Sequence, residues 1–161
     1  MGQQTRLLFV CLGNICRSPA AEGVFLNLLE KEQLQQRFLV DSAGTGGWHV
    51  GRLADPRMRA AAERRGLQLC SRARQLVAAD LRRFDHILTM DARNQADVMA
   101  LSRKTRGSIA RIEPMVQYLR MTQADDIPDP YGGGPAGFEH VLDLLEDACQ
   151  GLLEALVRRH S

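Results

Sequence analysis

Apolar residues along the chain fall into short runs typical of buried strands and longer stretches with helical spacing. Residues 7–10, rich in strand formers, predict a buried parallel strand that ends at Cys11. Further strands are predicted at 38–40, closed by Ser42-Ala43-Gly44, at 84–90 and at 109–112. Helical spacing predicts helices at 19–34, 56–65, 91–101 and 138–157. Ser18 is expected to be the N-cap of the first helix, with Pro19 at its first helical position.

The predicted elements alternate between strand and helix along the whole chain. This order predicts a parallel sheet with helices on both faces. We therefore expect an α/β fold with a single domain over residues 1–161 and a four-stranded parallel sheet. Ligands bind such sheets at the carboxyl ends of strands, where the chain turns into helices. The first turn of this kind is the segment 11–18.

Composition places the chain among ordinary globular proteins. It has 161 residues, of which 45% are hydrophobic and 25% charged. A chain of this length can fold without disulfides or metal, because it buries roughly two thirds of its unfolded surface. The apolar runs are too short to span a bilayer and no signal peptide is visible, so we expect a cytoplasmic protein with no membrane partner.

Charge is unevenly distributed, although the net charge is only +2. Residues 52–111 contain 14 Lys or Arg against 6 Asp or Glu, a local +8, and residues 112–161 contain 3 against 9, a local −6. Such a basic stretch can bind nucleic acid, but no nucleic-acid motif or interleaved aromatic platform accompanies it. We expect a solvated surface, or a positive field that attracts anionic substrates, and no nucleic-acid partner.

The four cysteines show neither a disulfide framework nor zinc spacing, so no metal site is predicted. Cys149 lies on the apolar stripe of a predicted helix, and Cys70 follows Leu67 and Leu69, so both are expected to be buried. Cys11 and Cys16 instead lie in the turn between the first strand and the first helix.

This turn combines a thiol at its start with a guanidinium near its end. Loop amides and a helix N-terminus form a nest for an anion, and Arg17 can hold two phosphate oxygens at once. The same positive field favours a thiolate nucleophile at Cys11, to which the Ser18 hydroxyl can donate a hydrogen bond. A nucleotide-binding role is disfavoured, because the NTPase and dinucleotide fingerprints are absent. The turn therefore predicts a phosphate-binding loop and phosphoryl transfer through a phosphocysteine.

A leaving group needs a proton, and Asp129 in Asp129-Pro130-Tyr131 is the candidate general acid. Pro130 restrains the backbone there, and Tyr131 can form a wall beside the site. The alternative is that Asp-Pro is only a turn signal. Its combination with the segment 11–18 favours the catalytic interpretation.

The segment 11–19, CLGNICRSP, together with the distant Asp129-Pro130-Tyr131, resembles the low-molecular-weight protein tyrosine phosphatases. The stretches 41–45, 55–57, 73–76 and 90–91 also resemble this family, so the resemblance covers nearly the whole chain. It implies hydrolysis of phosphotyrosine and aryl phosphates through a phosphocysteine, without a cofactor. Substrates would be tyrosine-phosphorylated proteins, and phosphate or sulfate would act as competitive anions.

The resemblance also implies a role for each matching residue. Cys11 would be the nucleophile, Arg17 the phosphate clamp, and Asp129 the general acid and then the general base for the hydrolytic water. Ser18 would stabilise the thiolate, while Asn14 and Ser42 would brace the loop. The expected substrate-binding residues are Leu12, Gly13, Asn14, Ile15, Cys16, Ser18, Trp48 and Tyr131. For Trp48, an exposed loop aromatic without a function is the alternative.

Two positions depart from the family pattern. Many members carry a His just before Ala-Arg-Gln, whereas Ser71-Arg72 precede Ala73 here. Eukaryotic members carry a second Tyr after Asp-Pro-Tyr, whereas three glycines, 132–134, follow here. We therefore do not expect regulation through paired tyrosines, and we expect a more mobile acid loop.

Four other functions fit part of the pattern. Arsenate reductases on this fold keep relay cysteines around the third strand, and residues 77–108 contain none. Protein-arginine phosphatases resemble the loop but carry Thr at the position of Ile15. Phosphocysteine carriers of sugar transport and purely redox-sensing thiol proteins need neither Arg17 nor Asp129.

Cys16 lies five residues after Cys11 in a loop that curls around one anion. Peroxide oxidises a reactive thiolate to a sulfenic acid, which a neighbouring thiol can trap as a disulfide. We expect a reversible Cys11–Cys16 switch, with a merely space-filling Cys16 as the alternative.

Overall fold

Four parallel strands form one sheet in the order β2-β1-β3-β4 in the computed structural model, which describes residues 3–159. The central strand β1 (Thr5–Cys11) pairs with β2 (Phe38–Gly44) on one side and with β3 (His86–Thr89) on the other. The strand β4 (Arg111–Pro114) pairs with β3 at the far edge. The expected four-stranded parallel sheet is thereby confirmed.

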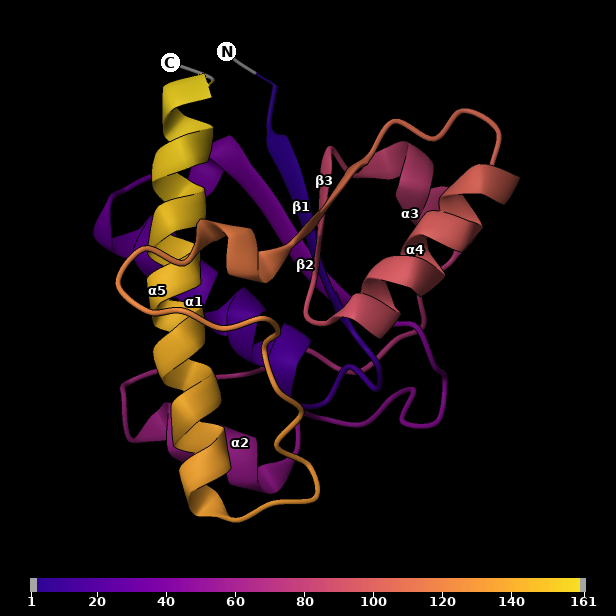
Figure 1. Cartoon of the computed structure of the whole chain (residues 1–161). Coiled ribbons are helices and arrows are strands. Elements are labelled where there is room, and N and C mark those ends of the chain that lie inside the picture. Colours follow the sequence, from indigo (N-terminus) through magenta and orange to yellow (C-terminus); the bar gives the residue numbers. More distant parts are fainter. Residues whose placement is uncertain (1–2, 160–161) are drawn as a thin grey trace.

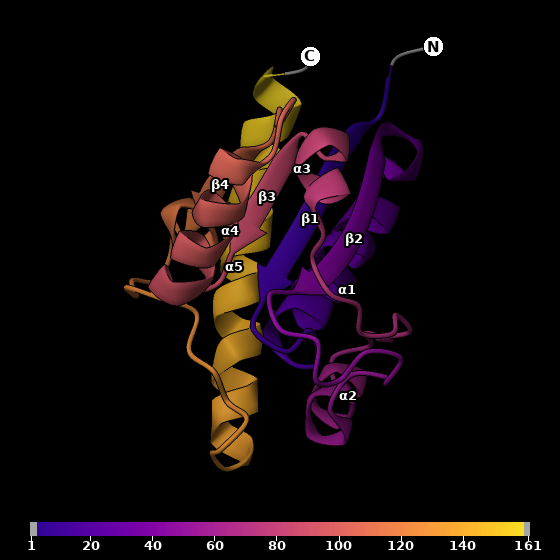
Figure 2. The same cartoon turned by 90° about the vertical axis from the view of Figure 1, so that its right-hand side faces the viewer.

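Helices cover both faces of this sheet, as the alternating order predicts (Figures 1 and 2). The layer of α1, α2 and α5 lies on one face and the layer of α3 and α4 on the other. In chain order the helices and short 3₁₀ turns are α1 (Arg17–Lys31), η1 (Gln35–Arg37), α2 (Pro56–Glu63), α3 (Ala78–Arg83), α4 (Ala92–Lys104), η2 (Met115–Tyr118) and α5 (Pro135–Arg159).

The side chains of β1 alternate between two hydrophobic cores. Leu7 and Phe9 lie in the core with α1 and α5, whereas Leu8 and Val10 lie in the core with α3 and α4. All four are fully buried, and burying each contributes roughly 1.5–3 kcal/mol. This burial fixes β1 firmly, so the segment that follows it at Cys11 starts from a rigid position.

The chain leaves β1 towards β2 on one side and returns to β3 on the other. Such a switch in direction opens a crevice at the carboxyl ends of the strands. The loop after β1 therefore faces the loop after β3 across this crevice.

Competing hydrogen bonds explain why the first helix begins at a different residue from the one predicted. The first helix begins at Arg17, with Cys16 in place of Ser18 as its N-cap. Ser18 cannot cap because its hydroxyl is engaged by two side chains of the preceding loop. Pro19 is tolerated in the first turn, where the missing N–H has no partner to lose. The helix ends at Lys31, and Gln33 turns the chain with a φ of 57°.

Other boundaries also shift. The short helix α3 was not predicted, and the fourth strand lies two residues later than expected. Cys149 is buried as predicted, but Cys70 is exposed, so that prediction is wrong. Leu67 and Leu69 are buried in an extended segment, and period-two alternation places Cys70 on the opposite side of the chain. Within residues 3–159, no helix is long and apolar enough to cross a membrane.

Candidate active site

The loop after β1 is held in a tight curl by backbone hydrogen bonds from the segment that follows β2. Thr45 N–H donates to the Cys11 carbonyl and Gly46 N–H to the Leu12 carbonyl, both at 2.9 Å. Gly44 allows this approach, because a Cβ there would lie 2.7 Å from the Leu12 oxygen. Within the loop, Asn14 has a φ of 57°, a left-handed conformation that Asn tolerates better than most residues.

Two polar groups of the loop converge on the Cys11 sulfur. The Ser18 Oγ lies 3.0 Å from Cys11 Sγ, and the backbone N–H of Asn14 donates to the same sulfur at 3.3 Å. The Asn14 side-chain amide donates to Ser18 Oγ at 2.7 Å, and the Ala43 carbonyl lies 3.4 Å from the same hydroxyl as a second acceptor.

The Asn14 side chain is itself fixed from behind. Its Oδ1 accepts a hydrogen bond from the backbone N–H of Arg74 at 3.0 Å. The Arg74 guanidinium in turn bridges Asp41 on β2 and Asp80 on α3. The brace that was expected from Asn14 is therefore anchored to the sheet and to a helix on its other face.

Ser42 does not take part in this brace, contrary to expectation. Its hydroxyl donates to Glu22 Oε1 of α1 at 2.6 Å, and among the described residues it forms no hydrogen bond with residues 11–18. Glu22 also forms a side-chain hydrogen bond with Ser71, one of the two residues that precede Ala73 in place of the family's usual pattern. Burial raises the pKa of Glu22, while its hydrogen bonds to Ser42 and Ser71 act in the opposite direction.

Arg17 is almost fully buried and held from two sides. Its Nη1 donates to Asp91 Oδ2 at 2.6 Å and to the Ile127 carbonyl at 3.0 Å. Asp91 was not predicted as a site residue. Its other carboxylate oxygen caps α4 by accepting the Asn94 N–H at 2.8 Å. The sequence did offer a signal for this role, because Asp91 directly follows the strand predicted at 84–90 and so lies at the same edge of the sheet as Cys11.

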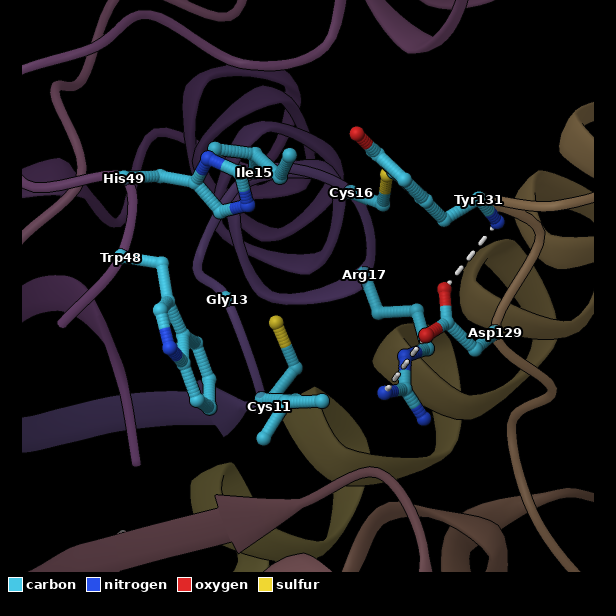
Figure 3. A pocket seen from close by; sticks show the side chains of 10 residues that line it. Cys11, Gly13, Ile15, Cys16, Arg17, Trp48, His49, Asp129 and Tyr131 are labelled. Carbon is cyan, nitrogen blue, oxygen red and sulfur yellow. Dashed lines mark hydrogen bonds and ion pairs between the residues drawn. The ribbon is translucent and has the colours of Figure 1, made fainter. Parts of the chain in front are cut away.

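A pocket of about 200 Å³ opens above Cys11 and Arg17. Trp48 and His49 lie on one side of it, and Asp129 and Tyr131 lie on the other (Figure 3). Of the expected substrate-binding residues, Asn14 and Ser18 do not line it. The lining residues are Cys11, Leu12, Gly13, Ile15, Cys16, Arg17, Trp48, His49, Asp129 and Tyr131.

His49 is a pocket residue that the sequence analysis missed. Its ring packs against Gly13, where a Cβ would lie 3.0 Å from His49 Cδ2, and its centroid lies 6.3 Å from that of Tyr131. Trp48, the neighbouring residue, is 70% exposed. The outer part of the pocket wall thus includes the exposed rings of Trp48 and Tyr131 and the half-buried ring of His49.

Asp129 reaches the pocket from a turn that it also stabilises. Its Oδ1 accepts the backbone N–H of Tyr131 at 3.1 Å, and its Oδ2 lies 3.8 Å from Arg17 Nη2. The turn interpretation and the pocket interpretation of Asp129 are thus both consistent with its position.

Cys16 lies in the same pocket but in a different environment from Cys11. Burial, with smaller contributions from Asp55 and Cys11, raises the pKa of Cys16 to about 12. Its thiol is therefore neutral near pH 7. Of the two sulfurs in the pocket, Cys11 is the one that receives hydrogen-bond donors from the loop.

The fold and these side chains define a class, the cysteine-dependent phosphatases with an anion-binding loop at the carboxyl end of a parallel strand. Residues 6–161 match the family model described as low molecular weight phosphotyrosine protein phosphatase, and the chain belongs to this family. It is therefore a protein tyrosine phosphatase, a hydrolase, and a phosphocysteine intermediate is characteristic of the family.

Relatives match along nearly their full length. The low molecular weight phosphotyrosine protein phosphatase of Schizosaccharomyces pombe is 40% identical over 157 residues, 97% of this chain and 99% of that protein. A protein tyrosine phosphatase from Entamoeba histolytica, solved with Hepes in its active site, superimposes with a TM-score of 0.90 at 39% identity, covering 98% of this chain and 100% of that one. YfkJ from Bacillus subtilis also has a TM-score of 0.90, at 35% identity and 99% coverage of both chains.

Proposed function

We propose that the chain hydrolyses phosphotyrosine in proteins, and aryl phosphates, with Cys11, Arg17 and Asp129 as its catalytic residues. The observation that carries the proposal is the convergence of a thiol, a buried guanidinium and a carboxylate in one pocket at the carboxyl end of β1. Leu12, Ile15, Trp48 and Tyr131 form the slot for the aromatic ring, and His49 joins this set.

In the first step, the Cys11 thiolate attacks phosphorus while the Arg17 guanidinium and the loop amides hold the other phosphate oxygens. The P–O ester bond breaks, and Asp129 gives its proton to the departing phenolate oxygen. Phosphocysteine and a free phenol result. The Ser18 hydroxyl stabilises the thiolate before attack and after its release.

In the second step, the Asp129 carboxylate takes a proton from a water molecule whose oxygen attacks the phosphocysteine. The S–P bond breaks, inorganic phosphate leaves, and the Cys11 thiolate returns. Free phosphate or sulfate therefore competes with substrate for the same cradle. The Entamoeba relative with Hepes in its active site supports a site that accepts other small molecules in place of substrate.

The proposal is tested with a parallel assay of aryl phosphate, phosphotyrosine peptide, phosphoserine peptide, phosphoarginine and arsenate. We expect turnover of the first two. Phosphoarginine is included because a Drosophila arginine phosphatase has a TM-score of 0.88 with this chain. Cys11→Ser should lower turnover by about 10⁴-fold or more while phosphate still binds. Substantial turnover by pure Cys11→Ser protein would exclude Cys11 as the nucleophile.

A reversible thiol switch is part of the proposal. Cys11 and Cys16 are both free and line the same pocket. Peroxide oxidises the Cys11 thiolate to a sulfenic acid, and the Cys16 thiol displaces water from it to form the disulfide. A thiol reductant then restores both thiols. Cys16→Ser should keep the activity of the reduced enzyme but make its peroxide inactivation mostly irreversible, and equal recovery of both proteins would rule the switch out.

A cytoplasmic location is the remaining part of the proposal. Its support is chemical, because all four cysteines are free thiols, the state that a reducing compartment maintains. Oxidation of the proposed nucleophile outside such a compartment would stop turnover.

A further inference from the structure

The segment that carries Asp129 has little packing of its own. Beyond Ile127 it runs through Pro130 and Tyr131 into three glycines before α5 begins at Pro135. A Cβ at Gly132 or Gly134 would meet nothing within 4 Å. Three successive glycines in open space leave many backbone conformations accessible. Some other contact must therefore limit where Asp129 lies.

One such contact is the ion pair of Asp129 Oδ2 with Arg17 Nη2 of α1, at 3.8 Å, and another comes from α2. Two hydrogen bonds stay within the segment, from Tyr131 N–H to Asp129 Oδ1 and from Gly133 N–H to the Pro130 carbonyl. Among the described residues, the side-chain hydrogen bond that ties residues 128–134 to α2 runs from Arg57 Nη2 to the Tyr131 carbonyl, at 2.9 Å, and the Gly137 N–H of α5 donates to the Gly134 carbonyl at 3.0 Å. Arg57 lies in the first turn of α2.

The Arg57 guanidinium is itself held in place. Its Nε and Nη2 donate to the two Asp55 carboxylate oxygens at 3.1 and 2.9 Å. It also stacks over the Phe138 ring at 4.8 Å and the Tyr131 ring at 5.4 Å. A guanidinium fork fixed by a bidentate carboxylate and aromatic faces loses little further freedom when it binds a carbonyl.

Asp55 connects this clamp to the phosphate loop. It is almost fully buried, it caps α2, and its backbone N–H donates to the Ile15 carbonyl at 2.7 Å. The hydrogen bonds to Arg57 hold the pKa of Asp55 below its usual range, so the carboxylate stays charged. A continuous chain of contacts thus runs from the phosphate loop through Asp55 and Arg57 to the backbone next to the acid.

We propose that Arg57 is a positioning residue for the general acid. By holding the Tyr131 carbonyl, two residues after Asp129, it keeps the Asp129 carboxyl within reach of the leaving-group oxygen above the phosphate loop. This inference rests on the proposed acid role of Asp129. Without the clamp, the glycine-rich segment samples other conformations, and Asp129 is in place for only part of the time.

The test compares leaving groups by kcat/KM, which covers the steps up to departure of the phenol. Arg57→Ala should lower kcat/KM by about 10-fold to 100-fold for phenyl phosphate, whose leaving group needs a proton. For dinitrophenyl phosphate, whose leaving group departs as an anion, the loss should stay below about 3-fold. The matched control is Arg64→Ala at the other end of α2, which removes an exposed ion pair with Glu139 and should change neither value more than about 2-fold.

Two further variants separate positioning from general damage to the fold. In an Asp129→Asn background, adding Arg57→Ala should cost less than about 2-fold, because there is no acid left to position. Arg57→Lys keeps a positive charge beside Asp55 but cannot hold both carboxylate oxygens and the carbonyl. It should show a smaller loss with the same dependence on the leaving group.

Equal losses for both substrates, or an undiminished effect of Arg57→Ala in the Asp129→Asn background, would overturn the inference. Failure of the underlying function has a different signature. If Asp129→Asn alone slowed both substrates equally, the acid role itself would be wrong, whatever Arg57 does.

Discussion

The two loops that meet above the pocket differ in almost every physical respect. The phosphate loop, residues 11–18, buries its key side chains, with Cys11 and Arg17 at 2% exposure. Hydrogen bonds from several elements hold it. In the acid loop, the Asp129 side chain is 47% exposed and Tyr131 is 50% exposed. The hydrogen bond from Arg57, a local turn and the ion pair between Asp129 and Arg17 hold that loop.

This difference matches the two parts of the proposed chemistry. Donors that bind a phosphoryl group work best when they are already in place, since no energy is then lost in reorganising them during the reaction. An acid that protonates a bulky leaving group must let that group enter and depart, so it benefits from a movable support. A closely bonded, buried segment and a more exposed one, distant in the sequence, thus carry the two parts of the proposed chemistry.

Asp129→Asn tests the loop that carries the proposed acid, and it should have the largest effect of the three changes described here. We expect kcat/KM for phenyl phosphate to fall by about 10²- to 10⁴-fold, the range for a positioned general acid. Competitive inhibition by phosphate should change little, because the amide cradle and Arg17 are untouched. A large loss of phosphate binding would show that the two loops do not divide the work as proposed.

Asn14 variants test the phosphate loop. Asn14→Ala removes the bonds to Ser18 and to the Arg74 N–H, and it places Ala at a left-handed φ, which costs about 1–2 kcal/mol. We expect kcat/KM to fall by about 10-fold for every leaving group, with weaker inhibition by phosphate.

Asn14→Gly is the matched control for this change. It removes the same side-chain bonds but has no difficulty with a φ of 57°. If both variants lose activity equally, the side-chain bonds carry the effect. If Gly restores most of the activity, backbone conformation alone supports the loop and the brace is unimportant.

Glu22→Gln tests the buried contacts of Glu22 with Ser42 and Ser71, and it should have the smallest effect. Because burial raises the pKa of Glu22, the folded chain holds that proton more tightly than the unfolded chain does. The charged carboxyl therefore lowers stability increasingly as the pH rises through and above the ordinary Glu range. A neutral Gln should raise the melting temperature near pH 7 by roughly 2 °C, and the gain should shrink near pH 4. A gain that is independent of pH would show that charge burial is not its cause.

The phosphate loop could be predicted from the sequence because its parts are contiguous. A buried strand, a turn and a helix start within 15 residues place Cys11 and Arg17 at one helix N-terminus, whatever the rest of the chain does. The position of Asp129 depends instead on how the chain returns from β4 to α5. No local periodicity specifies that path, and family resemblance supplied the pairing.

Several of the differences between prediction and structure, although not the exposure of Cys70, arise from tertiary partners that compete with local rules. Ser18 has the sequence signature of an N-cap, but Cys11 and Asn14 engage its hydroxyl. Ser42 lies at the right sheet edge, but its hydroxyl faces Glu22. His49 was missed because its contact with Gly13 depends on the course of an irregular loop.

The strict alternation of β1 between two cores has a consequence for how this gene can vary. Deleting or inserting one residue between positions 7 and 10 would exchange the residues that face α1 with those that face α4. The same shift would move the start of the phosphate loop relative to Gly44, whose backbone passes against it. Length changes should therefore be tolerated in the glycine-rich segment before α5 and selected against in β1, so that point substitutions are the route by which this strand diverges.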